Sequence, residues 1–392
     1  MNLIVNPLAA IETVDETGEL ILGGPVPGRG MKYLHLSASE CPRLHSLLTE
    51  LPIVGLRDLN VDADLEPDEL ELLRDYGVLI GPENVPERPL FSCMLDDVEA
   101  SGALPASLIV NPTLELQPFD LAKFRSWMQE KHLSPYNATA WVTDPATKIR
   151  WGYWLTPAQA ELVGNLQTGS DVLPDIDPEL KSKLTAAHIL IDADSAGLSK
   201  RVDTISRAAD QFARDRYAVI TDVVPPAQLR ALQDYFRRYV EQGFMKFGDM
   251  QVERRFAEHG EPVAKMFLET LEPFMGAITR VPIERTYAYT AVYAEGAELR
   301  PHVDREACVF SFSFQLEYLP EPDDGVSPWP LYLSQNDPAD LNVDPQRDTA
   351  IHLANGGFLA YKGREIIHYR TPLPAGHRSA SIFFHYVPVG SE

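Results

Sequence analysis

Cysteines, long apolar runs and basic residues are all scarce in this sequence. The three cysteines, Cys41, Cys93 and Cys308, show no paired spacing, which excludes a disulfide scaffold and favours a reducing compartment, the cytoplasm. No apolar run reaches the roughly 18 residues of a membrane span, and the N-terminus lacks a basic region followed by an apolar stretch. We therefore expect neither a transmembrane helix nor a signal peptide.

The shortage of basic residues gives the chain a formal net charge of -23, from 57 acidic and 34 basic residues. Proteins that bind nucleic acids use clustered Lys and Arg to displace counterions, so DNA and RNA are not expected partners. Hydrophobic residues make up 45% of the sequence, which is ordinary for a globular protein with a sizeable core. The 392 residues are enough for about two or three domains.

Two histidines and one aspartate form the most informative pattern. His302 and Asp304 are two residues apart, and a strand places residues i and i+2 on one face, so both side chains can reach one point. His368 lies in a short apolar segment that follows a glycine-bracketed strand. Two imidazoles and one carboxylate on one side of a metal form the facial triad of non-haem Fe(II) sites, which keeps coordination positions open.

Each of these residues also has a simpler interpretation. His302 and Asp304 alone would suit a solvated pair in a turn, because such triplets arise by chance. His368 alone would suit a hydrogen-bonded histidine in the core. If His368 is not the third ligand, His352 or His377 is the alternative in the same strand-rich region.

The surrounding segments extend the pattern to a family. Residues 289–314 and 357–384 alternate short apolar strands with turns around the three residues. This arrangement resembles the Fe(II)/2-oxoglutarate-dependent oxygenases, most closely the branch that includes the prolyl 4-hydroxylases, over about residues 200–390. The resemblance implies a double-stranded β-helix, or jelly roll, in which His302, Asp304 and His368 hold Fe(II).

The resemblance also implies a site for 2-oxoglutarate. Arg378, ten residues after His368, would bind its far carboxylate, because a planar guanidinium makes two parallel charge-assisted hydrogen bonds to such a group. Tyr293 matches a tyrosine that often contacts the same carboxylate. One departure stands out: the family often shows Arg-x-Ser, whereas Ser379 directly follows Arg378 here, so the serine contact is absent or comes from Ser379 or Ser381.

The activity that the resemblance implies uses 2-oxoglutarate and O2 as co-substrates. We expect hydroxylation of an amino-acid or peptide-like substrate in a biosynthetic pathway, with succinate and CO2 as co-products. Asp304 disfavours halogenation, because halogenating relatives carry a small residue in its place, whereas desaturation, ring formation and epimerisation stay open. Two other functions stay open, a non-catalytic metal-binding sensor of the cupin type and a peptide-binding adaptor that has lost turnover.

The N-terminal region has a different pattern. Residues 1–85 are expected to form a winged-helix-like α+β unit of hairpin, two helices and closing strand, with the segments 19–22, 31–36, 39–48, 67–77 and 78–80. This unit resembles the PqqD-like domains, which bind leader peptides. The alternative is a structural cap on the C-terminal domain.

The remaining chain divides into two further regions of an α+β protein. Residues 86–200 are expected to form a mixed intermediate region with helices over 119–131 and 156–166, and an aromatic cluster at 151–154 that either lines a cleft or fills a core. Residues 201–392 form the expected oxygenase domain.

Supporting helices are expected at the start of this last domain, over 203–214 and 226–239, with a strand at 217–221 between them. A partly basic loop follows. Its Arg254 and Arg255 are named for substrate binding, because loops at the mouth of such barrels usually meet the substrate.

Overall fold

The computed structural model describes residues 3–14, 17–50, 56, 59–100, 104–118, 138–193 and 195–391, with the side chains of residues 195–201 and 204 left aside. Contacts within the chain define two units. Unit 1 comprises Met1–Pro89 and Phe236–Ala257, and unit 2 comprises Leu90–Tyr235 and Glu258–Glu392. The helix expected over 119–131 lies outside the described residues. The three-part division at residues 85 and 200 stays a prediction.

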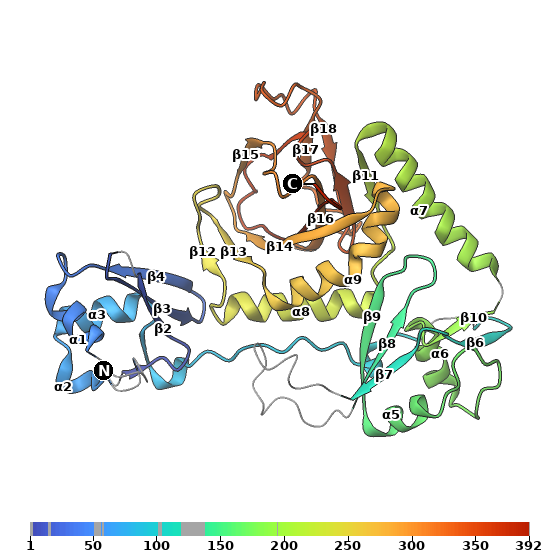
Figure 1. Ribbon diagram of the computed structural model, residues 1–392, viewed down its shortest axis with the longest axis horizontal. Helices are drawn as coiled ribbons and strands as arrows, with labels where there is room; N and C mark the ends of the chain where they lie inside the picture. The colour runs from blue at the N-terminus through green and yellow to red at the C-terminus, as the bar shows by residue number, and fades with distance from the viewer. Residues whose placement is uncertain are drawn as a thin grey trace. The chain divides into compact units, whose positions relative to one another are not determined.

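Unit 1 is built on an antiparallel meander, β2-β3-β4, packed on short helices (Figure 1). Alternate apolar residues of β3, such as Leu20 and Leu22, pack with Leu44 and Leu73 of the helices. The elements are β1 (Ile4–Val5), β2 (Ala10–Val14), β3 (Glu19–Val26), β4 (Gly30–Leu36), α1 (Pro42–Thr49), α2 (Val61–Asp64), α3 (Pro67–Asp75), β5 (Leu79–Ile80), the 3-10 turn η2 (Pro82–Asn84) and β12 (Lys246–Phe247).

The expected hairpin, two helices and closing strand are therefore present in unit 1, and the structure adds β2, α2 and a pairing of β1 with β5. The strand β13 (Arg255–His259) pairs with β12, which in turn pairs in parallel with β4. Assignment of this unit to the winged-helix class stays a prediction.

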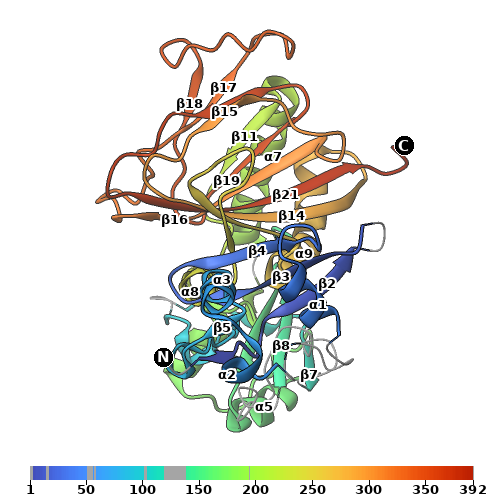
Figure 2. The same ribbon diagram turned by 90° about the vertical axis from the view of Figure 1, so that its left-hand side faces the viewer.

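The large sheet of unit 2 has the strand order β11-β19-β16-β21-β14. All four pairings are antiparallel, and Figure 2 shows β16, β21 and β14 side by side. The bounds are β11 (Tyr217–Ile220), β14 (Ile283–Tyr293), β16 (Phe310–Leu319), β19 (Phe358–Tyr361) and β21 (Arg378–Pro388). The strand expected at 217–221 is thus confirmed, as are apolar strands within 289–314 and 357–384, and several extend beyond these ranges.

Side chains of the large sheet alternate between an apolar and a polar face. On β16, Phe312 and Phe314 point to one face and Ser311 and Ser313 to the other, as the two-residue period of a strand requires. The apolar face packs on helix α9 (Pro262–Thr279), where Phe274 lies 6.2 Å from the ring of Phe358. The polar face is left to line the interior between the sheets.

A second, smaller antiparallel sheet has the order β15-β20-β17-β18. Its strands are β15 (Leu299–His302), β17 (Leu331–Ser334), β18 (Thr349–Ile351) and β20 (Ile367–Arg370). Side chains of this sheet contact the polar face of the large one: the rings of His368 and Tyr361 lie 4.8 Å apart. Unit 2 is therefore a mixed α+β structure with two facing sheets, consistent with the expected jelly roll.

Three long helices belong wholly or partly to unit 2: α7 (Ser195–Asp215), α9, and α8 (Pro226–Glu241), whose residues from Phe236 onward belong to unit 1. The helices expected over 203–214 and 226–239 are confirmed. Helix α9 was not predicted, although Glu261 caps its N-terminus by accepting from the backbone N–H of Ala264, and Pro262 occupies its first turn. Its buried residues cover the apolar face of the large sheet. No helix in the described ranges is long and apolar enough to cross a membrane.

The described part of the intermediate region forms small sheets and two short helices. The elements are η3 (Leu95–Asp97), β6 (Leu108–Val110), β7 (Glu115–Pro118), β8 (Ala138–Thr143), β9 (Arg150–Leu155), α5 (Pro157–Gly164), α6 (Pro178–Ala186) and β10 (Leu190–Asp192). Helix α5 confirms the helix expected over 156–166, with Thr156 as its N-cap in a capping box with Gln159. Trp151 and Tyr153 of β9 are fully buried, so this part of the aromatic cluster fills a core.

Candidate metal centre

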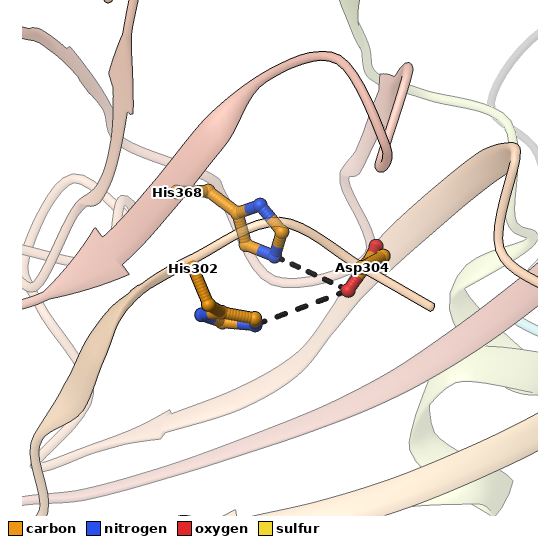
Figure 3. Close-up of side chains that lie close together, drawn as sticks. All are labelled: His302, Asp304 and His368. Carbon is orange, nitrogen blue, oxygen red and sulfur yellow. Dashed lines mark ion pairs between the residues drawn. The ribbon is translucent and has the colours of Figure 1, made fainter. Parts of the chain in front are cut away.

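The structure brings His302, Asp304 and His368 together between the two sheets (Figure 3). His302 ends β15 and lies directly opposite His368 of β20. Asp304 follows two residues later, and its Oδ1 lies 3.9 Å from Nε2 of His302 and 3.5 Å from Nε2 of His368. One ligand atom from each residue lies within 4.8 Å of the other two. A metal ion among these atoms would have all three protein ligands on one side.

Hydrogen bonds from the far ring nitrogens orient both imidazoles. Nδ1 of His302 lies 2.8 Å from the carbonyl oxygen of Arg300, and Nδ1 of His368 lies 3.0 Å from that of Ile366. A carbonyl oxygen only accepts, so each Nδ1 carries a proton and donates it. The lone pair is thereby left on Nε2, which faces Asp304. This is the outer support that metal-binding histidines usually have.

Electrostatics keep the carboxylate ionised. Burial by itself would raise the pKa of Asp304, but His368, His385 and the Ser311 hydroxyl outweigh it and hold that pKa below its ordinary value. For His368 the signs are opposite: burial by itself would lower its pKa, but the Asp304 carboxylate and the hydrogen bond to Ile366 more than offset burial and raise that pKa. The pair is therefore an ionised carboxylate beside a basic imidazole. Such a pair is better suited to binding a cation than to packing in an apolar core.

A serine and a further histidine orient Asp304 from behind. The Ser311 hydroxyl donates to Oδ2 of Asp304 at 2.6 Å, and Nδ1 of His385 lies 3.0 Å from the same hydroxyl. Burial lowers the pKa of His385 to about 4, so its imidazole is neutral and its Nδ1–H donates to Ser311. Oδ2 is thus engaged, and Oδ1 is left for a metal.

The Ser311→Ala variant is expected to weaken Fe(II) binding by roughly 10–100-fold, because loss of an outer partner of a metal ligand typically has an effect of this size. The matched control is Ser313→Ala, on the same face of β16, whose buried hydroxyl has no hydrogen-bond partner among the described residues. Anaerobic equilibrium dialysis with Fe(II) measures both. Equal affinities in the two variants would show that the Ser311 hydrogen bond does not orient Asp304.

A backbone position also shapes the centre. The backbone N–H of Asp304 donates to the carbonyl oxygen of Gly363 at 2.9 Å. A Cβ added at Gly363 would collide with Oδ2 of Asp304 and lie 2.5 Å from Oγ of Ser311. Only glycine therefore leaves room for the carboxylate in this position.

A second group of ligand atoms adjoins the first. Asp304, Cys308 and His385 also lie within 4.8 Å of one another. Burial raises the pKa of the Cys308 thiol to about 11, and Tyr287 contacts its sulfur at 3.1 Å. A neutral thiol is a poor metal ligand, so the group with two oriented imidazoles is the better candidate.

The two residues predicted for 2-oxoglutarate lie at the ends of neighbouring strands. Tyr293, the last residue of β14, is buried and pairs with Ser379 of β21. Arg378, the first residue of β21, is half-buried and pairs with Leu319 of β16. Their predicted contacts with the co-substrate stay predictions.

The two arginines predicted for substrate binding belong to unit 1. Arg255 is buried, and its Nε donates to Oδ2 of Asp249 at 2.7 Å, while Arg254 is exposed at the surface. Their role in substrate binding stays a prediction.

The alternative ligands do not join the three residues. Nδ1 of His352 lies 2.9 Å from the carbonyl oxygen of Ser327, and Nδ1 of His377 lies 2.8 Å from the hydroxyl of Tyr318. Among the described residues, neither histidine is part of a group that could hold a metal. His368 is therefore the third ligand that the geometry favours.

One arginine in unit 2 was missed in the sequence. Arg370 follows His368 by two residues on β20 and is only 2% exposed. Its Nη1 donates to the carbonyl oxygen of Trp329 at 2.7 Å, and its guanidinium carbon lies 4.4 Å from the centre of the Trp329 ring. The sequence contained the relevant pattern. Residues i and i+2 of a strand share a face, so a strand through His368 places Arg370 on the same face as His368.

Neither the known family models nor the curated proteins include a match to this chain. Solved structures that resemble it include a prolyl-4-hydroxylase from Pseudomonas putida, 14% identical with a TM-score of 0.38, covering 47% of this chain and 100% of that one. AviO1 from Streptomyces viridochromogenes Tue57 is 20% identical with a TM-score of 0.38, covering 48% and 96%. HygX from Streptomyces hygroscopicus, solved with nickel, 2-oxoglutarate and hygromycin B, is 11% identical with a TM-score of 0.36, covering 47% and 87%.

One of these structures is of a prolyl-4-hydroxylase, and another was solved with 2-oxoglutarate bound. At such identities and TM-scores, the roles of residues in this chain rest on its own geometry.

Proposed function

We propose that this protein is a non-haem Fe(II)- and 2-oxoglutarate-dependent dioxygenase. The observation that carries the proposal is the convergence of two oriented imidazoles and one ionised carboxylate, His302, His368 and Asp304, on one point between the sheets. Three such ligands on one face of an octahedral ion leave three positions for other groups. The residues present would therefore hold Fe(II) and leave positions for 2-oxoglutarate and dioxygen.

Each residue of the centre has a part in this function. His302 and His368 would bind through Nε2 while their Nδ1–H groups stay fixed on backbone carbonyls, and Asp304 would bind through Oδ1 while Ser311 holds Oδ2. The chemistry that the bound groups supply is oxidative decarboxylation of 2-oxoglutarate to succinate and CO2, coupled to hydroxylation. The carboxylate ligand Asp304 disfavours halogenation as the outcome.

The substrate that we propose is an amino-acid or peptide-like molecule, met in the cytoplasm. A peptide would suit the proposed PqqD-like role of residues 1–85, and Arg254 and Arg255 remain the proposed contacts to it. The net charge of -23 supports a substrate other than a nucleic acid.

Anaerobic titration with Fe(II) and then 2-oxoglutarate tests the proposal. We expect the weak visible absorption band of a keto acid bound to Fe(II) through two oxygens, and slow formation of succinate once air is admitted. Asp304→Ala should show neither signal. A folded wild-type protein that binds Fe(II) but gives no band and no succinate would contradict the oxygenase function and support a cupin-type sensor instead.

A further inference from the structure

Arg370 is a buried cation without a buried anion. Its side chain is almost fully enclosed, and among the residues that the structure describes no carboxylate pairs with it. The guanidinium has two described polar or aromatic contacts, both with Trp329, and its Nε has no hydrogen-bond partner. A buried charge is costly unless it is paired. The arrangement is therefore incomplete without an anionic group.

The position of Arg370 places that missing anion beside the metal centre. Arg370 and His368 share one face of β20, two residues apart. Tyr361 lies 4.8 Å from the His368 ring, and Tyr293 lies 5.2 Å from the Trp329 ring. The Arg370 guanidinium, the two tyrosine rings and the His368 imidazole thus line the same interior between the two sheets.

Arg378 lies on the face of β21 that points away from the interior between the sheets. On β21, His385 points to the interior because its ring contacts Ser311, and alternation places Phe383, Ser381 and Ser379 on the same side. The two pairing irregularities add a residue to β14 and to β16, not to β21, so the alternation along β21 is unbroken.

A hydrogen bond supports this alternation. The Ser379 hydroxyl accepts from Nε2 of Gln315 at 3.1 Å, and Gln315 belongs to the polar face of β16 with Ser311 and Ser313. Arg378 consequently shares the face of Ala380 and Ile382, and Ile382 packs with residues of α9.

We propose that Arg370, rather than Arg378, binds the far carboxylate of 2-oxoglutarate. This inference rests on the proposed function and assigns its co-substrate contact. Arg370 offers the unpaired Nε–H to a carboxylate while Nη1 stays fixed on Trp329. Ser381, whose buried hydroxyl has no partner among the described residues, and Ser379 supply hydroxyl groups on the facing strand. This assignment explains the departure from Arg-x-Ser. Ser379 and Ser381 face the interior, whereas Arg378, at the start of the same strand, faces the other side.

The test compares three arginines by anaerobic titration of the Fe(II)-loaded protein with 2-oxoglutarate, following both the absorption band and the heat of binding. Arg370→Gln should raise the Kd for 2-oxoglutarate by roughly 10–100-fold, the usual effect of losing hydrogen bonds to a charged group, and leave the Kd for Fe(II) within about threefold. Arg370→Lys keeps the charge and should still lose most of this affinity, because an ammonium cannot reproduce the guanidinium geometry. Arg364→Gln, at an exposed arginine before β20, is the control.

Arg378→Gln decides between the two assignments even if the Arg370 variants do not fold. Unchanged 2-oxoglutarate affinity in Arg378→Gln supports the proposal, and a loss there overturns it, whatever the Arg370 variants show. Unchanged affinity in a folded Arg370→Gln also overturns it. Failure of the wild-type protein to bind 2-oxoglutarate at all would instead end the proposed oxygenase function, so the two failures are distinguishable.

Discussion

The His368→Ala variant is expected to lose Fe(II) binding altogether under conditions in which the wild-type protein is saturated. Alanine removes one of three ligand atoms and leaves Asp304 without its nearest imidazole, 3.5 Å away. The loss should exceed the roughly 10–100-fold weakening that follows removal of an outer-shell partner. Anaerobic equilibrium dialysis with Fe(II) measures the affinity, and circular dichroism shows whether the variant is folded.

Two other histidines serve as controls for this variant. His352→Ala and His377→Ala remove the alternative ligands, whose Nδ1 atoms are engaged by Ser327 and Tyr318. Both variants should bind Fe(II) as the wild-type protein does. Because His368 is buried, His368→Gln provides a second variant that fills more of the space. Full Fe(II) binding by a folded His368→Gln and His368→Ala would show that another side chain is the third ligand.

The metal-site residues could be predicted because each lies in a short local pattern. His302 and Asp304 were expected to share one strand face, whereas β15 ends at His302 and Asp304 lies just beyond it, still within reach. His368 sits in an apolar segment after a glycine-bounded strand. Their meeting depends on the pairing of β15 with β20, which the family resemblance supplied and the spacing alone did not.

The support around Asp304 was visible in the sequence but not used. The run from Phe310 to Phe314 alternates Phe and Ser, so one face of the strand had to be apolar and the other hydroxyl-bearing. Only the structure shows that the serine face meets Asp304. His385 gave no local sign, because its contact with Ser311 joins strands far apart in sequence.

The choice between Arg370 and Arg378 depends on information that no single segment contains. Which face of β21 looks inward is set by its neighbours, where β14 and β16 each accommodate an extra residue. A one-residue change in such a register turns every side chain to the opposite face. The family resemblance therefore favoured Arg378, whereas burial and strand alternation favour Arg370.

The Gly363→Ala variant is expected to weaken Fe(II) binding by roughly 100-fold or more, beyond the effect of removing an outer-shell partner. The added Cβ would overlap Oδ2 of Asp304 and lie 2.5 Å from Oγ of Ser311 and 2.7 Å from the carbonyl oxygen of Cys308. Since Gly363 does not have a left-handed φ, the backbone itself accepts alanine, and the effect comes from moving the carboxylate. Overpacking should also lower the free energy of unfolding by about 1–3 kcal/mol.

Gly276→Ala is the matched control for this substitution. A Cβ at Gly276, in helix α9, would meet its nearest atoms at 3.8 and 3.9 Å, so alanine should stabilise the protein by about 0.5–1 kcal/mol and leave Fe(II) binding unchanged. The double variant Gly363→Ala/Ser311→Ala adds a sharper test, because removing Oγ of Ser311 gives the carboxylate room to move. The fold loss of Fe(II) affinity in the double variant should be smaller than the product of the two single fold losses, because substitutions at contacting sites are not additive. Wild-type Fe(II) affinity in a folded Gly363→Ala would mean that the metal is not held through Asp304.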